Sequence, residues 1–485
     1  MVDAAGPLGR RFLQLARVDS AAPALLGADG AVIATRGELA RAALVVRDAV
    51  LRCAPRAPAA IWLPNGAPFV GAFAGLALAG RPVGLIDASA TREEVERCLA
   101  ATGGRTLLTT AERAAGWPVA WHGEGIALAL PDPGTTATLP AATALLKLTS
   151  GSSGVPRAIA VSARQLAADT VQIFRTMTVG GSDRTLAAIP LSHSYGIGSC
   201  LVPLLLAGTP LVFPASTLPA ALADALARAR VAHFPAVPAM VRALATFGGL
   251  PDLPDLRVAL SAGAPLAPAD AAAFHAATGR KVHVFYGSSE CGGITYDRSE
   301  AAVHEPGAVG TAMARVVVDV VDDGDRPLPA GAEGRVRVHS RAAALAILPA
   351  PDDERTLVPG RFLTGDLGRL DEAGRLTLTG RVAAELNVAG KKVHPDEVRR
   401  VLLELPGVRS AVVLGIPDPH RGEIVAALVE AEPDSGVDVR AVLETCRARL
   451  APHKVPRRVV VVDRLPLSER GKLQRDEALR LLRGA

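Results

Sequence analysis

The sequence Leu148-Thr149-Ser150-Gly151-Ser152-Ser153-Gly154-Val155-Pro156-Arg157 separates two short apolar runs, at 144–148 and 158–161, that are typical of β-strands. Its glycines allow backbone N–H groups to turn inward, and successive inward N–H groups form a concavity that binds anions. The hydroxyl groups add hydrogen-bond donors, and Arg157 adds a positive charge whose geometry suits phosphate. The stretch therefore predicts a phosphate-binding loop. It lacks the spacing of a Walker A loop, and a flexible Ser/Gly-rich linker would have a similar composition.

Length and composition set the class of protein. A chain of 485 residues exceeds what one hydrophobic core usually serves, so we expect at least two domains. The net charge of +5 is spread along the chain, and 3% aromatic residues are too few to suggest stacking platforms for nucleic acid. Five cysteines without a C-x-x-C spacing indicate a reducing, cytoplasmic setting, and the start of the chain does not resemble a signal peptide. The longest apolar stretch is too short for a membrane span.

Strands alternate with helices over the first three hundred or so residues. Apolar runs predict strands, several helical patterns lie between them, and Thr91 with Glu94 forms the capping box of one helix. This alternation predicts an α/β fold with mostly parallel sheets. Because several strands end in polar or small-residue loops, we expect one shared cleft at their carboxyl ends. The predicted strands are 31–35, 59–63, 82–86, 106–109, 184–189, 211–213, 233–234, 258–260 and 282–285.

The pattern changes after about residue 307. Short strands with Asp-Gly and Gly-x-Gly turns predict a small β-barrel-like region, including a hairpin at 368–379. After Gly380 and Arg381, helices alternate with strands in a mixed α+β pattern up to a terminal helix beyond Arg475. The sequence therefore predicts a large N-terminal domain, 1–380, and a small C-terminal domain, 381–485, joined at 380–384.

Seven further short motifs occur along the chain after the central loop. They are Pro-Leu-x-His-x-x-Gly at 190–196, Gly-Ala-Pro at 263–265, Tyr-Gly-Ser-Ser-Glu at 286–290, Thr-Gly-Asp at 364–366, Gly-Arg at 380–381, Gly-x-x-Val-x-Pro-x-Glu-Val at 390–398 and Gly-Lys-x-x-Arg at 471–475. With the central loop, this set resembles the adenylate-forming (AMP-binding) superfamily of acyl- and aryl-CoA synthetases, peptide-synthetase adenylation domains and luciferases. The resemblance covers nearly the whole chain. It implies that the C-terminal domain is a mobile lid.

The resemblance implies ATP, Mg²⁺ and CoA as cofactors and assigns roles to individual residues. Glu290 would bind the metal, and Asp366, expected at a strand end, would accept hydrogen bonds from the ribose. Lys472 would neutralise charge as the adenylate forms. The catalytic residues would be Lys472, His193, Glu290 and Arg381, and the nucleotide would contact Thr149, Ser150, Gly151, Ser152, Ser153, Gly154, Arg157, Gly263, Ala264, Pro265, Tyr286, Gly287, Ser288, Ser289, Asp366 and Arg381.

Five positions depart from the family pattern. They are Arg157 for the usual lysine, Ala158 for a glycine, Ser289 for a threonine, Ala383 where the hinge usually carries Asp or Lys, and Leu467 where a lysine is common. The acyl pocket would include His193 and Tyr195, and the paired glycines after Cys291 are expected to leave room for an extended or flat acyl group. The other candidate pocket residues are His233, Phe234, Gly263, Gly287, Ser288, Cys291, Gly292 and Gly293.

The resemblance favours an ATP-dependent acyl- or aryl-CoA ligase acting on a small-molecule carboxylic acid. Amino acids are disfavoured as substrates, because His193 lies in the region where amino-acid-activating domains carry an aspartate. An enzyme that loads the thiol of an acyl carrier protein is the alternative, and an inactive homologue that serves as a binding module is a third. The sequence identifies neither the acid nor the oligomeric state.

Overall fold

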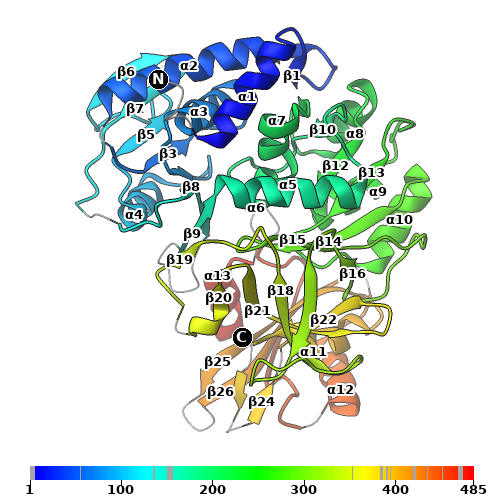
Figure 1. The fold of residues 1–485 in the computed structure, drawn as a ribbon. Coiled ribbons are helices and arrows are strands. Elements are labelled where there is room, and N and C mark those ends of the chain that lie inside the picture. The colour runs from blue at the N-terminus through cyan, green and yellow to red at the C-terminus, as the bar shows by residue number, and fades with distance from the viewer. Residues whose placement is uncertain are drawn as a thin grey trace. The chain divides into compact units, whose positions relative to one another are not determined.

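The computed structural model describes residues 6–54, 56–134, 137–149, 157–351, 353–382, 386–388, 391–393, 395–418, 422–433, 435–450, 452–467 and 473–484. The chain divides into two compact units. The first comprises Met1–Val318, Arg337–Leu363 and Ala373–Leu376, and the second comprises Asp319–Val336, Thr364–Glu372 and Thr377–Ala485. Figure 1 shows the helices and strands, most of them labelled, coloured along the chain.

An eight-stranded sheet in the first unit has the order β19-β9-β8-β4-β3-β5-β7-β6. Its central strands β8, β4, β3 and β5 are parallel, as the alternation of helices and strands predicts, and antiparallel strands flank them. Val95 and Leu99 of the helix α4 (Arg92–Thr102) pack against apolar residues of β3 and β5. The strands are β3 (Ala59–Trp62), β4 (Val83–Leu85), β5 (Thr106–Thr109), β6 (Val119–Gly123), β7 (Ile126–Ala129), β8 (Thr143–Thr149), β9 (Arg157–Ser162) and β19 (Ala346–Leu348).

A longer sheet in the same unit contains the order β16-β15-β14-β13-β12-β10-β11-β1-β2. The strands from β14 to β1 are parallel, and antiparallel strands lie at each end. β10 is shorter than the predicted strand 184–189. The strands are β1 (Pro23–Leu26), β2 (Val32–Thr35), β10 (Thr185–Leu186), β11 (Leu211–Val212), β12 (His233–Ala236), β13 (Val258–Ser261), β14 (Val282–Ser288), β15 (Gly292–Tyr296) and β16 (Ala308–Ala312).

Capping boxes begin three of the helices in the first unit. The Thr91–Glu94 box predicted from sequence is present, and Thr35 and Ser162 begin α2 and α5 in the same way, which satisfies backbone N–H groups that a helix start leaves free. The helices are α1 (Pro7–Val18), α2 (Arg36–Cys53), α3 (Ala67–Leu78), α4 (Arg92–Thr102), α5 (Ala163–Met177), α6 (Ser194–Gly196), a π-helical turn (Ile197–Leu201), α7 (Val202–Ala207), α8 (Pro219–Arg228), α9 (Pro238–Ala245) and α10 (Pro268–Thr278).

The short strands expected beyond residue 307 are present. β17, β18, β21 and β22 lie next to one another in that order, and β20 pairs with β21. The boundary between the two units passes through β17, β18, β21 and β22. The elements are β17 (Val317–Val321), β18 (Glu333–His339), a 3₁₀ turn (Glu354–Thr356), β20 (Leu357–Val358), β21 (Arg361–Leu370) and β22 (Arg375–Arg381).

The C-terminal part of the second unit is a mixed α+β fold, as predicted. Its sheet has the order β24-β23-β26-β25, and β27 pairs with β26 in parallel. Successive residues of β26 enter two separate apolar clusters, one on each face, because side chains alternate along a strand. The elements are β23 (Leu386–Val388), β24 (Lys391–Val393), α11 (Pro395–Leu403), β25 (Val408–Asp418), β26 (Gly422–Ala431), α12 (Val439–Arg449), β27 (Arg458–Val462) and α13 (Arg475–Gly484). Within the described residues, no helix combines the length and apolar character that crossing a membrane requires.

Candidate active site

The 289–291 turn (Ser289, Glu290 and Cys291) joins the antiparallel strands β14 and β15. The sequence predicted that β14 ends at residue 285, with the Tyr-Gly-Ser motif in a loop beyond it. In the structure β14 continues through Ser288, because Tyr286 pairs with Thr295 and Ser288 with Gly292 across the hairpin. The motif therefore lies on a strand, and only its last two residues lie in the turn.

Side chains and backbone from several elements hold the 289–291 turn. The Nζ atom of Lys147, on β8, donates a hydrogen bond to the carbonyl oxygen of Ser289 at 3.0 Å, and Ser194 Oγ donates to Ser289 Oγ at 2.7 Å. The backbone N–H of Ala344 donates to the carbonyl of Glu290 at 2.7 Å. These contacts fix the backbone on either side of the Glu290 carboxyl group.

The Glu290 side chain itself is half-buried and has no hydrogen-bond partner among the described residues. Mg²⁺ is commonly bound by one or two carboxylates together with substrate phosphates and water. In the part of the chain that the structure describes, no group of three or more acidic, His or Cys side chains could hold a metal alone. A single available carboxylate fits a metal ion that a nucleotide helps to bind.

The two strands that flank the central loop are antiparallel neighbours, and Thr149 pairs with Arg157. Arg157 is exposed at the start of β9. The predicted phosphate contacts between them, Ser150, Gly151, Ser152, Ser153 and Gly154, lie outside the described residues, as does Lys472.

The Gly-Ala-Pro motif forms an exposed turn directly after β13. Gly263 has a φ of +84°, a left-handed conformation that favours glycine. Because β13 and β14 are parallel, with Ser261 opposite Val284, this turn and Tyr286 lie toward the same edge of the sheet. The structure thus brings together two of the predicted adenine- and phosphate-contacting motifs.

His193 is held by an aspartate that sequence reasoning did not identify. Its Nε2 atom lies 2.8 Å from Oδ2 of Asp87, and Asp87 Oδ1 accepts hydrogen bonds from the backbone N–H and hydroxyl of Ser89. Asp87 directly follows the β4 region, and His193 precedes α6. The contact fixes the orientation of the imidazole ring.

Asp366 and Arg381 form an ion pair within the second unit. Arg381 Nε donates to Asp366 Oδ1 at 2.6 Å, and the aspartate is buried whereas most of the arginine is exposed. The expectation that Asp366 lies at a strand end is wrong, because β21 runs from Arg361 to Leu370 and the aspartate is in its interior. The strand continues past the motif into the predicted hairpin.

The paired glycines do not leave room for an acyl group, contrary to the expectation from sequence. A Cβ atom on Gly292 would lie 2.3 Å from Oδ1 of Asp169, and one on Gly293 would lie 2.5 Å from the sulfur of Met313. At Gly287 a Cβ would meet the carbonyl of Gly292 at 2.7 Å. Glycine is needed at these positions because neighbouring atoms already occupy the space.

Two other candidate pocket residues are core residues of β12. Phe234 is 0% exposed and His233 is 2% exposed, so neither faces an open cavity in this structure. His233 Nδ1 lies 3.3 Å from the hydroxyl of Thr185. Burial lowers the pKa of His233 to about 4.

The buried His233 gives a testable pH dependence. The unfolded chain takes up a proton at this histidine below pH about 6.5 while the folded protein stays neutral, so stability falls as pH decreases from 6.5 toward 4, by as much as about 3 kcal/mol. His233→Gln should remove this contribution. Urea unfolding at pH 7 and pH 4.5 measures it, and an equal loss of stability on acidification in both proteins would contradict the assignment.

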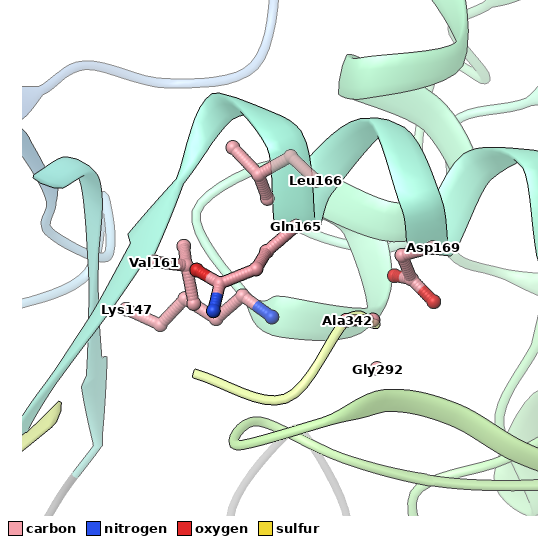
Figure 2. A pocket seen from close by; sticks show the side chains of 7 residues that line it. All are labelled: Lys147, Val161, Gln165, Leu166, Asp169, Gly292 and Ala342. Carbon is pink, nitrogen blue, oxygen red and sulfur yellow. The ribbon is translucent and has the colours of Figure 1, made fainter. Parts of the chain in front are cut away.

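Two charged residues near the 289–291 turn were not among the site residues predicted from sequence. Lys147 lies in an otherwise apolar strand, and Asp169 lies on the face of α5 that also carries Leu166 and Ile173. Both are buried, and Figure 2 shows them lining a narrow pocket together with Gln165. The sequence does indicate them, because a lysine or aspartate at an apolar position of a strand or helix is rarely buried without a partner.

Comparison with known proteins agrees with the motifs. The family model "AMP-binding enzyme" matches residues 22–347, and its C-terminal domain model matches residues 397–472. A feruloyl-CoA synthase of Amycolatopsis sp is 30% identical over 69% of each chain. The uncharacterized acyl-CoA ligase YhfT of Bacillus subtilis is 29% identical over 89% of this chain and 90% of its own. The structure of the amide bond synthetase McbA from Marinactinospora thermotolerans has a TM-score of 0.80 at 27% identity, covering 97% of this chain and 98% of its own.

The matched residues include both the strands that flank the central loop and the 289–291 turn, and the relatives extend over most of the chain. The resemblance derived from the motifs is therefore confirmed. This chain belongs to the AMP-binding enzyme family, within which it is similar to acyl- and aryl-CoA synthetases.

Proposed function

We propose that the protein is an AMP-forming acid–thiol ligase. It activates a carboxylic acid with ATP to an acyl-adenylate, releasing pyrophosphate, and then transfers the acyl group to the thiol of CoA, releasing AMP. One observation carries this proposal beyond the motifs. Lys147, two residues before Thr149 on the strand that enters the central loop, is hydrogen-bonded to the carbonyl of Ser289. The strand that leads into the predicted phosphate loop is thus attached to the turn that carries the predicted metal ligand.

The described residues support distinct parts of the reaction. Thr149 and Arg157, at the ends of the central loop, would contact the phosphates, and Glu290 would hold Mg²⁺, which supplies positive charge to the reacting phosphate. Ser289 would donate to the α-phosphate, and Tyr286 would lie against adenine. Such a site acts chiefly by positioning the two reactants and stabilising developing charge.

A change of domain orientation is part of the proposal. We place the functional boundary between 1–380 and 381–485, as the sequence predicts. Lys472 would act in adenylation. The segment 387–393, with Lys391 and Lys392, resembles the segment that lines the pantetheine tunnel in CoA ligases and would act in thiolation. Lids of this kind exclude water and exchange catalytic groups between steps. A cytoplasmic location also belongs to the proposal, and it is consistent with five free cysteines.

The acceptor is the least constrained part of the reaction. The feruloyl-CoA synthase and YhfT are named for CoA chemistry, whereas McbA is named for amide formation. The thiol of a carrier protein remains the alternative acceptor, because its phosphopantetheine arm presents the same thiol group as CoA.

The proposal is tested with a panel of carboxylic acids that includes hydroxycinnamic and fatty acids. Acid-dependent pyrophosphate exchange reports adenylation, and AMP release is then compared with CoA, with a holo-carrier protein, with an amine and without an acceptor. We expect exchange with at least one acid and AMP release that depends on CoA. AMP release only with the carrier protein would support the alternative, and no exchange with any acid would contradict adenylation.

Asp366 provides a prediction specific to the nucleotide. Asp366→Ala should raise the KM for ATP at least about 10-fold, because a hydrogen bond to a charged acceptor contributes about 1.5–3 kcal/mol. Asp322→Ala is the control, since it removes a carboxylate that pairs with Arg326 outside the predicted motifs. An unchanged KM for ATP in Asp366→Ala, or an equal change in both variants, would contradict a role of Asp366 in binding the ribose.

A further inference from the structure

Lys147 and Asp169 are a pair of opposite charges buried inside the first unit. Lys147, on β8, is 5% exposed and Asp169, on α5, is 7% exposed. They come from different elements and line the same narrow pocket (Figure 2). Neither residue belongs to a motif that the proposed reaction uses.

Each member of the pair bonds to the backbone at one side of the 289–291 turn. Lys147 Nζ donates to the carbonyl oxygen of Ser289 at 3.0 Å, before Glu290. Asp169 Oδ1 accepts from the backbone N–H of Gly293 at 2.9 Å, after Glu290. The turn is therefore held on both sides by hydrogen bonds to side chains of opposite charge, and hydrogen bonds to charged groups are stronger than those between neutral groups.

The backbone of the turn is adapted to the carboxylate of Asp169. Gly292 has a φ of +70°, and a Cβ atom there would lie 2.3 Å from Asp169 Oδ1. The aspartate thus occupies the position where any other side chain would begin. This close approach requires glycine at 292 and sets the distance between α5 and the start of β15.

Keeping two charges in this position is costly for the fold. Burial lowers the pKa of Lys147 and raises the pKa of Asp169, and in each case the opposite charge of the partner acts against that shift. Well-packed apolar side chains at such sites are often no less stabilising than a buried charged pair. The pair therefore provides directional hydrogen bonds to two defined backbone atoms, which apolar contacts would not provide.

We propose that Lys147 and Asp169 are positioning residues that hold the 289–291 turn so that Ser289 and Glu290 are preorganised for the metal–phosphate group. The proposal rests on the proposed function, because it assigns the pair to the same site. Lys147 also ties the turn to the strand that enters the central loop. β8 and the carboxylate that would bind the metal are thereby held together.

The test compares Lys147→Met and Asp169→Asn with a matched control, Gln172→Met. Gln172 is also a buried polar residue of α5, but its amide bonds to Ser340 and not to the turn. Two readouts are used on the full chain. One is the Mg²⁺ concentration that half-saturates pyrophosphate exchange, and the other is the affinity for Mn²⁺ with ATP in the absence of acid, measured by electron paramagnetic resonance.

Lys147→Met should raise the half-saturating Mg²⁺ concentration and weaken Mn²⁺ binding, each at least about 10-fold, and excess Mg²⁺ should restore part of the rate. Asp169→Asn keeps an oxygen acceptor for Gly293 and should have a smaller effect, about fivefold. The KM for CoA should not change. Gln172→Met should lower the melting temperature without altering either metal readout.

Two results would show that the pair only stabilises the fold and would overturn the proposal. One is an unchanged metal affinity in Asp169→Asn, and the other is that both variants have the same effects as Gln172→Met. This holds even where Lys147→Met is not recovered as folded protein, since the asparagine variant keeps its shape. Failure of the proposed function looks different. In that case the wild-type protein itself shows no acid-dependent exchange and no binding of Mn²⁺ with ATP.

Discussion

Lys472→Ala should slow acid-dependent pyrophosphate exchange at least about 100-fold, the loss typical when one group that stabilises a transition state is removed. Lys472 lies outside the described residues, and the expectation rests on its place in the Gly-Lys-x-x-Arg motif at 471–475. If the lysine acts only in adenylation, thioester formation from a supplied acyl-adenylate should continue at the wild-type rate. Measuring both half-reactions on one preparation separates the two effects.

Lys454→Met is the control for this experiment. Lys454 lies in the same unit, and its Nζ atom forms a 2.7 Å ion pair with Glu397, which is a structural contact within the C-terminal fold. We expect this variant to keep adenylation. Full-rate exchange in Lys472→Ala would remove the lysine from the mechanism, and loss of both half-reactions would argue against separate domain orientations for the two steps.

Gly292→Ala is expected to have the second largest effect. Its Cβ would lie 2.3 Å from Asp169 Oδ1, and the φ of +70° disfavours any side chain. Backbone strain of about 1 kcal/mol and overpacking of about 1–3 kcal/mol should together lower the free energy of unfolding by roughly 2–4 kcal/mol. Because the change displaces the 289–291 turn, pyrophosphate exchange should also fall strongly in the protein that remains folded.

Gly279→Ala separates strain from overpacking. Gly279 ends α10 with a φ of +64°, yet a Cβ there would have no neighbour within 4 Å. It should therefore cost only the backbone part, about 1 kcal/mol, and leave exchange unchanged. Urea denaturation of the two variants gives the comparison, and equal losses would mean that Asp169 moves aside to admit the new methyl group.

The features that sequence predicted well are those set by local pattern. Alternating apolar runs and helical stretches indicated the parallel strands of the first unit, and Thr91 with Glu94 located the start of α4. The α+β character of the C-terminal part followed from the same kind of pattern. Motifs with a fixed order indicated the family even though each motif alone is weak.

The features that sequence could not predict depend on partners far along the chain. Gly292 and Gly293 suggested open space, but Asp169 and Met313 fill it. β14 continues past its predicted end because β15 pairs with it, and no property of Tyr286 itself indicates this. Lys147 and Asp169 were detectable as charges at apolar positions, but their common attachment to one turn appears only when β8 and α5 are placed beside it.

The two apolar clusters of the C-terminal sheet have a consequence for how this family can be recombined. Both clusters are formed by residues between Leu386 and Leu482, so this stretch provides the cover for both faces of its own sheet. A segment with its own core meets the main physical requirement for an independently folding module. Related ligases could therefore exchange this segment as a block, and the chimaeras would retain an intact interior on each side of β26.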